Sequence, residues 1–122
     1  MVRGVRGAIT VSQDDPLEIL TATRELVEAL IDENPTMICE EMASILFTVT
    51  DDIVSVYPAQ AAREMGWFQV PLMCAREIPV ENSLQFCIRV LIHWNTDLSQ
   101  DEINHVYLGE AAVLRPDLNL VK

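Results

Sequence analysis

Residues 84–95, with the sequence LQFCIRVLIHWN, form the strongest strand pattern in the chain. Side chains alternate between the two faces of a strand, so residues of the same parity share a face. One face carries Leu84, Phe86, Ile88, Val90, Ile92 and Trp94, and the other carries Gln85, Cys87, Arg89, Leu91, His93 and Asn95. We therefore expect a strand over residues 84–95 with its fully apolar face in the core.

Other strands are expected on both sides of this one in the sequence. Residues 2–9 are β-branched and interrupted by glycines, and residues 45–49 and 106–108 are short apolar runs. Residues 70–74 also have strand character, and Pro71 predicts that they form an edge strand or an irregular one. Together these segments predict a sheet of about five strands.

Two main helices complete the expected fold. The first begins at Asp14-Asp15-Pro16, a typical helix start, and ends at Asn34-Pro35. Its apolar stripe is expected to consist of Leu17, Leu20, Val27 and Ile31, with Leu26 and Leu30 beside them. The second covers residues 58–65 and stops at Gly66, and a helical turn is expected at 101–105. The expected fold is a single α/β (α+β) domain over residues 1–122 with a mixed sheet.

Composition excludes several classes of function. The chain has 122 residues, of which 50% are hydrophobic, and 19 acidic residues against 8 basic ones give a net charge of −11. Nucleic-acid binders and proteins of anionic membranes need broad basic surfaces, so we expect neither partner. So much apolar sequence in so short a chain also predicts that other subunits cover part of it.

The cysteines and histidines predict neither disulfides nor a metal site. Cys39, Cys74 and Cys87 are widely spaced and odd in number, which is typical of free thiols in a reducing cytoplasm. His93 and His105 have no partners at ligand spacing. No apolar run approaches a membrane span, and the first residues lack the apolar core of a signal peptide. We expect a cytoplasmic protein.

Four side chains could carry chemistry, and each also has a purely structural interpretation. Arg89 lies mid-strand and is either solvated or held by anionic partners. Arg6 is flanked by glycines that would let a ligand approach the backbone. Glu77 alone fits a solvated strand end, and Tyr107 alone fits the core. Arginines make up seven of the eight basic residues, which fits forked recognition of carboxylate or phosphate as well as simple composition bias.

The sequence lacks a Ser/His/Asp arrangement, a P-loop, a GxGxxG fingerprint and a paired-histidine motif. Covalent, metal-dependent and nucleotide-dependent chemistry are therefore not expected, and neither is a cofactor. The remaining arginines, glutamate, tyrosine and thiol predict a site for a small polyanion.

Five segments resemble the monofunctional chorismate mutases of the AroH class: VRGVRGAITV, YPAQAAREMGW, VPLMCAREI, CIRVLIHWNTD and HVYLGEAAVLRPDL. The resemblance runs from Arg3 to about Leu118 and is most specific in the last segment. It implies a homotrimer that forms a pseudo-α/β barrel, with active sites between subunits. It also implies an isomerase that converts chorismate to prephenate without a cofactor, in the biosynthesis of phenylalanine and tyrosine.

The resemblance also implies roles for individual residues. Arg89 matches the cation at the ether oxygen of chorismate, and Arg6 and Tyr107 match ligands of substrate carboxylate. Glu77 and the segment of Met73 and Cys74 match groups near the ring hydroxyl. The resemblance also places Tyr57, Arg63, Leu114 and Arg115 at the pocket. Arg115 is expected to begin a mobile C-terminal tail over about 115–122. Gln60 departs from the pattern, since relatives can carry lysine there.

Two alternatives compete with the enzyme. A non-catalytic trimer that binds a small anionic metabolite would need Arg6 and Tyr107 but no cation at an ether oxygen, so Arg89 together with Glu77 favours the enzyme. An interaction module with an acidic surface predicts that the arginines are scattered over the molecule.

Overall fold

The computed structural model describes residues 1–114, which form one mixed sheet in the order β3-β2-β4-β1-β5. Strand β4 is antiparallel to both of its neighbours, β1 and β2, while the outer pairs β2–β3 and β1–β5 are parallel. The strands are β1 (Val2–Thr10), β2 (Met42–Val49), β3 (Leu72–Arg76), β4 (Cys87–Asn95) and β5 (Val106–Tyr107). The expected mixed sheet with two helices is confirmed, with β3 at one edge.

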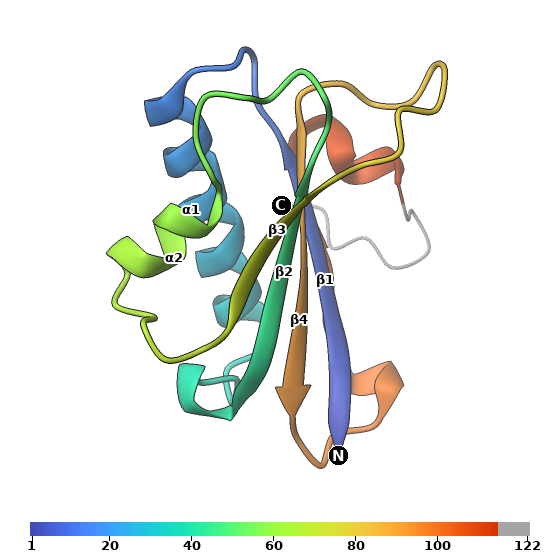
Figure 1. Cartoon of the computed structure of the whole chain (residues 1–122). Helices are drawn as coiled ribbons and strands as arrows, with labels where there is room; N and C mark the ends of the chain where they lie inside the picture. The colour runs from blue at the N-terminus through green and yellow to red at the C-terminus, as the bar shows by residue number, and fades with distance from the viewer. Residues whose placement is uncertain (115–122) are drawn as a thin grey trace.

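Both α-helices lie on the same side of the sheet (Figure 1). They are α1 (Pro16–Glu33) and α2 (Ala59–Glu64), and three short 3₁₀ turns are η1 (Cys39–Glu41), η2 (Gln100–Glu102) and η3 (Gly109–Val113). Turn η2 agrees with the helical turn expected near residue 101, whereas η1 and η3 were not expected. No helix within residues 1–114 is long and apolar enough to cross a membrane.

Helix α1 begins and ends as its sequence predicts. Asp15 is the N-cap and its carboxylate accepts the backbone N–H of Glu18, with Pro16 in the first turn. Asn34 is the C-cap, and its side chain donates to the carbonyls of Leu30 and Asn104. The side chain of Asn34 thus ties the end of α1 to the segment before β5.

The expected apolar stripe of α1 is partly wrong. Leu17 is 74% exposed, and Leu20 and Ile31 are only half-buried, although Leu26, Val27 and Leu30 lie in the core as expected. Successive helical residues are turned by about 100°, so a residue two positions before buried Ile19 points away from the sheet. The face that packs on the sheet consists of Ile19, Ala22, Thr23, Leu26, Val27 and Leu30.

Strand β4 begins three residues later than the alternating pattern predicts. Phe86 has a φ of 49°, a left-handed conformation that ends the strand geometry before Cys87. The carboxylate of Asp52 accepts the Phe86 N–H at 3.0 and 3.2 Å, and the Thr50 hydroxyl accepts the Cys87 N–H at 3.0 Å. These two side chains stabilise a backbone conformation that the sequence of β4 does not reveal.

Within β4 the predicted alternation is confirmed. Ile88, Val90, Ile92 and Trp94 are buried in the core beneath the helices, whereas Arg89, Leu91 and His93 are half-buried on the opposite face. We call this opposite side the open face, because Figure 1 shows neither α1 nor α2 over it. The open face is where the candidate site lies.

Gly7 lets β1 approach α1 closely, so a methyl group added at this position is expected to destabilise the fold. A Cβ at Gly7 would lie 2.9 Å from Leu30 Cδ1, 3.0 Å from Leu26 Cδ1 and 3.2 Å from the Val106 carbonyl oxygen. We expect Gly7→Ala to lower the free energy of unfolding by about 1–3 kcal/mol, as overpacking does. Denaturant titration of the purified variant measures this change.

Gly4→Ala is the matched control, because a Cβ at Gly4 would meet only Leu91 Cδ1, at an ordinary 3.4 Å. Its denaturation midpoint should stay close to that of the parent. Equal midpoints for both variants would contradict the close packing of β1 on α1.

Candidate active site

Arg89, Glu77 and Thr48 meet on the open face. Arg89 lies opposite Thr48 in the β2–β4 register, and Glu77 follows β3, where its backbone N–H donates to the Val49 carbonyl at 2.9 Å. The Thr48 hydroxyl donates to Glu77 Oε2, and Arg89 Nε lies 3.6 Å from the same oxygen. Both charged side chains are about three-quarters buried, with 26% and 24% exposed. Of the two interpretations of Arg89 from the sequence, a solvated side chain or one held by an anionic partner, the second is therefore the one found.

Arg6 and Tyr107 form a second contact beside this group. The Arg6 guanidinium carbon lies 5.9 Å from the centre of the Tyr107 ring, within the range of a cation–π interaction. Tyr107 on β5 pairs with Ala8, and Ala8 pairs with Arg89 on its other side. His105 Nδ1 accepts the Arg6 backbone N–H at 2.9 Å, so the imidazole helps to fix this part of β1.

Two buried polar atoms of this site have no hydrogen-bond partner. They are Arg89 Nε and the Tyr107 hydroxyl, and among residues 1–114 no other buried side-chain nitrogen or oxygen shares this property. The 3.6 Å contact of Arg89 with Glu77 is an ion pair and too long for a hydrogen bond. Buried donors without partners are uncommon in folded proteins. Each atom therefore keeps a hydrogen-bond donor that no residue of the described chain uses.

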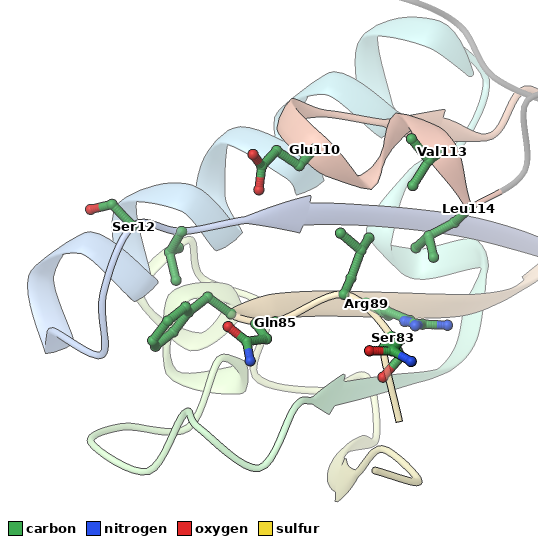
Figure 2. A pocket seen from close by; sticks show the side chains of 11 residues that line it. Ser12, Ser83, Gln85, Arg89, Glu110, Val113 and Leu114 are labelled. Atoms are coloured by element: carbon green, nitrogen blue, oxygen red, sulfur yellow. The ribbon is translucent and has the colours of Figure 1, made fainter. Parts of the chain in front are cut away.

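Arg89 lines an open cavity of about 700 Å³. Figure 2 shows Arg89, Ser83 and Leu114 gathered at one end of this cavity, with Ser12 at the other end. Leu114 follows turn η3, so a segment distant in sequence closes one side of the space. The other lining residues are Val11, Asn82, Leu84, Gln85, Phe86, Glu110 and Val113.

Tyr57 and Cys74 line a different cavity, of about 580 Å³, that Arg89 does not reach. Cys74 pairs with core residue Phe47 in the β2–β3 register, so its side chain points to the helix side of the sheet. Glu77 is on the open face, as alternation over three residues requires. A bulge that would bring Cys74 and Glu77 together is not found.

The remaining expected site residues do not share one position in the fold. Met73 is 68% exposed and pairs with Leu46, and Arg63 on α2 lines a smaller cavity with Trp67 and Phe68. Gln60 lines the cavity of Tyr57. Arg115 lies outside the described residues, and so does the expected C-terminal tail.

Cys87 is fully buried beside this site, in a small cluster with Ala8, Tyr107 and Ala111. Burial raises the pKa of its thiol, and the nearby Arg89 charge opposes this effect only in part. The thiol therefore stays protonated at neutral pH and packs as a small apolar group. Within residues 1–114 no three His, Cys, Asp or Glu side chains are grouped so that they could hold a metal ion.

Thr48 is the site residue that the sequence analysis missed. Nothing distinguishes one threonine in an apolar strand, and its importance follows from the register that places it opposite Arg89. The expected residues Arg6, Glu77, Arg89, Tyr107 and Leu114 lie around the open face, while Tyr57 and Cys74 lie apart from them. The clustering of Arg6 and Arg89 argues against scattered surface arginines.

Comparisons with known proteins identify the family of the chain. The family model of chorismate mutase type I matches residues 2–118. The chain is 55% identical to chorismate mutase AroH of Thermus thermophilus over 118 residues, covering 97% of each chain. It is 47% identical to chorismate mutase AroH of Bacillus subtilis over 123 residues, covering 100% of this chain and 96% of the relative.

A solved structure has the same fold. The structure of a chorismate mutase from Clostridium thermocellum superposes with a TM-score of 0.88 at 44% identity, covering 91% of this chain and 98% of that one. A family model that spans nearly the whole sequence, two relatives matched over nearly their full lengths and this superposition lead to one conclusion: the chain belongs to the type I chorismate mutase family.

Proposed function

We propose that this chain is a chorismate mutase, an isomerase that rearranges chorismate to prephenate in the biosynthesis of phenylalanine and tyrosine. The observation that carries the proposal is the pair of buried, unpartnered donors, Arg89 Nε and the Tyr107 hydroxyl, on one face of the sheet. Chorismate is a dianion with an ether oxygen. Its carboxylate and ether oxygens could accept hydrogen bonds from these two donors.

Arg6 and Tyr107 are proposed to bind a substrate carboxylate. The Arg6 guanidinium already lies over the Tyr107 ring, so binding does not have to order two independent side chains. The net charge of −11 repels a dianion, and attraction must therefore come from a local group of arginines. Arg115 follows Leu114 in the sequence, and we propose that it adds a further cation.

Arg89 is proposed to stabilise the transition state. In the rearrangement the C–O bond breaks ahead of C–C bond formation, which places negative charge on the ether oxygen. A fixed guanidinium next to that oxygen binds the transition state more strongly than the ground state. The cavity walls must also hold the flexible side chain of chorismate over its ring, which lowers the entropic part of the barrier.

Glu77 is proposed to orient the ring hydroxyl and to balance the Arg89 charge. Its Oε2 already accepts from Thr48 and faces Arg89 Nε, so the carboxylate is fixed from two sides. The rearrangement is pericyclic and transfers no proton to the enzyme, so Glu77 acts as a charged ligand and needs no acid–base step.

The direct test is to incubate the purified protein with chorismate and to follow the loss of ring-diene absorbance. We expect turnover by the parent and a loss of more than about 10³-fold in Arg89→Ala, because a full charge is removed and Glu77 is left unpaired. Arg89→Lys should recover only part of the activity, because it lacks the planar fork.

Citrulline at position 89 separates charge from shape, since it keeps the shape and most donors but is neutral. Turnover within about threefold of the parent would remove the proposed transition-state role of Arg89 and leave geometry as the source of the rate. Tight chorismate binding without turnover by the parent would instead identify a non-catalytic binding protein.

Thr48→Val tests the role of the hydroxyl that holds Glu77. The substitution keeps the shape and removes one hydrogen bond to a charged group, typically worth about 1.5–3 kcal/mol. We expect turnover to fall by roughly 10-fold or more, while Thr48→Ser stays within about threefold of the parent. Steady-state kinetics of both variants measure this, and equal rates would show that Glu77 is oriented without Thr48.

We further propose a homotrimer that closes a pseudo-α/β barrel, with its active sites between subunits. Within one chain Arg89 and Tyr57 line different cavities, and a site between subunits would bring Arg89 of one copy and Tyr57 of another to the same substrate. Met73, Leu46 and Leu91 pair in one apolar row across the open face, and this row supplies a surface for another subunit.

Mixing two inactive variants tests shared sites. Arg89→Ala and Tyr57→Glu, which sets a carboxylate against the dianion, should each have little activity as separate trimers. After the two are unfolded and refolded together in equal amounts, roughly a quarter of the sites should contain an intact Arg89 and an intact Tyr57. Recovery of activity is expected, and sedimentation should give about three chain masses. No recovery from correctly assembled trimers would place each site within one chain.

A further inference from the structure

We propose that Arg76 is a positioning residue that, together with Asp14, fixes the segment before Tyr57 and so sets the aromatic wall of the substrate cavity. The inference rests on the proposed function, because it assigns Tyr57 to that cavity. Arg76 is the last residue of β3, and Asp14 lies in the loop before α1. Two distant parts of the chain thus hold the same segment.

Arg76 holds the carbonyl groups of this segment. Its Nη1 donates to the Thr50 carbonyl at 2.7 Å and to the Ile53 carbonyl at 2.9 Å. The Thr50 carbonyl also accepts the Ile53 N–H at 3.1 Å, so the guanidinium closes a turn that directly follows β2. Arg76 pairs with Val49 in the β2–β3 register, which fixes its position on the helix side of the sheet.

Asp14 holds the amide groups that come next. Its Oδ1 accepts the backbone N–H groups of Val54 at 3.2 Å and Ser55 at 3.1 Å. Hydrogen bonds, above all from the Ser55 side chain, lower the pKa of Asp14, and the Arg76 charge acts in the same direction. The carboxylate is therefore ionised and remains an acceptor at neutral pH.

Tyr57 is consequently fixed on both sides in the sequence. Ser55 is held by Asp14, and the Tyr57 carbonyl accepts the Gln60 N–H at 3.0 Å where α2 begins. Only Val56 separates the two anchored residues, although the Tyr57 side chain itself is 71% exposed. A rigid backbone beneath an exposed ring is what an aromatic wall of a preformed site requires.

Arg76 also connects the two parts of the proposed site. It is followed directly by Glu77, and alternation places the two side chains on opposite faces of the sheet. Arg76 reaches the segment of Tyr57, while Glu77 reaches Thr48 and Arg89. Neither contact of Arg76 involves the proposed reacting atoms, so we expect it to act on substrate capture.

The test compares Arg76→Met with Arg76→Lys. Arg76→Met removes all donors and should raise KM for chorismate by about 5-fold or more with kcat within about 2-fold, because the wall contributes binding shared by ground state and transition state. Arg76→Lys can still donate to at least one carbonyl and should recover part of the loss. Amide hydrogen exchange at Val54 and Ser55 should accelerate in the Met variant and less in the Lys variant.

Arg24→Met is the matched control for the lost charge, since Arg24 lies on the outer surface of α1 in an exposed pair with Glu28. It should change neither KM nor exchange at Val54. Asp14→Ala should reproduce the KM effect of Arg76→Met. The double variant should raise KM by less than the product of the single effects, because both side chains hold one segment.

The inference would be overturned by unchanged exchange at Val54 and Ser55 in Arg76→Met, by faster exchange with an unchanged KM, or by an equal KM increase in Arg24→Met. A fall in kcat in proportion to folded protein, with KM constant, would also overturn it, since that indicates only a structural role. Faster exchange in a protein whose parent never turns over chorismate would instead count against the proposed function.

Discussion

The alternation of side chains along β4 is the constraint on which the rest of this structure depends. Strand β4 is hydrogen-bonded on both sides, so it cannot slip or rotate without breaking two ladders. A shift of one residue would turn Ile88, Val90 and Ile92 out of the core and drive Arg89 into it. Burial of apolar side chains beneath the helices therefore fixes Arg89 on the open face. The position of the proposed catalytic charge is maintained by the hydrophobic core.

The surroundings of Arg89 then determine what this charge can do. A partly buried guanidinium loses solvation, and Glu77 offsets this loss from 3.6 Å without taking the Nε hydrogen bond. Thr48 occupies the nearer position on the Glu77 carboxylate, which keeps that carboxylate directed toward Arg89. The result is a charge that is balanced but still has a free donor. An oxygen that gains negative charge during a reaction is a suitable acceptor for it.

Much of this arrangement could be predicted from the sequence, and the exceptions have physical reasons. Periodicity identifies β4 and α1 because both patterns are long, and the caps of α1 are formed by residues next to it in the sequence. The late start of β4 could not be predicted, since it depends on Asp52, which is 34 residues away from Phe86 in the chain. The exposure of Leu17 was missed because a count of leucines does not fix the rotation of a helix about its axis.

For the candidate site, the sequence indicated Arg89 and Glu77 but could not indicate what holds them. Thr48 became visible only through the pairing of β2 with β4, and Arg76 only through carbonyl groups that precede it by more than 20 residues. Every residue has a backbone carbonyl group, so the amino-acid sequence does not indicate which carbonyl a side chain will contact. Such contacts are seen only in the folded structure. The resemblance to a family supplied the grouping of Arg6 with Tyr107 that spacing alone did not give.

The register across the sheet links assembly with chemistry. Two rows of paired residues cross the open face. The first row consists of Met73, Leu46, Leu91 and Arg6. The second row, two residues further along each strand, consists of Ala75, Thr48, Arg89, Ala8 and Tyr107. The two rows are two residues apart along the strands, a distance of only about 7 Å. In the proposed trimer, a subunit that covers the apolar row also brings its own side chains close to Arg89. Water is then excluded from the charged row by the same contact that stabilises the assembly, and electrostatic stabilisation strengthens as water leaves. Formation of the interface and activation of the site would therefore be one physical event.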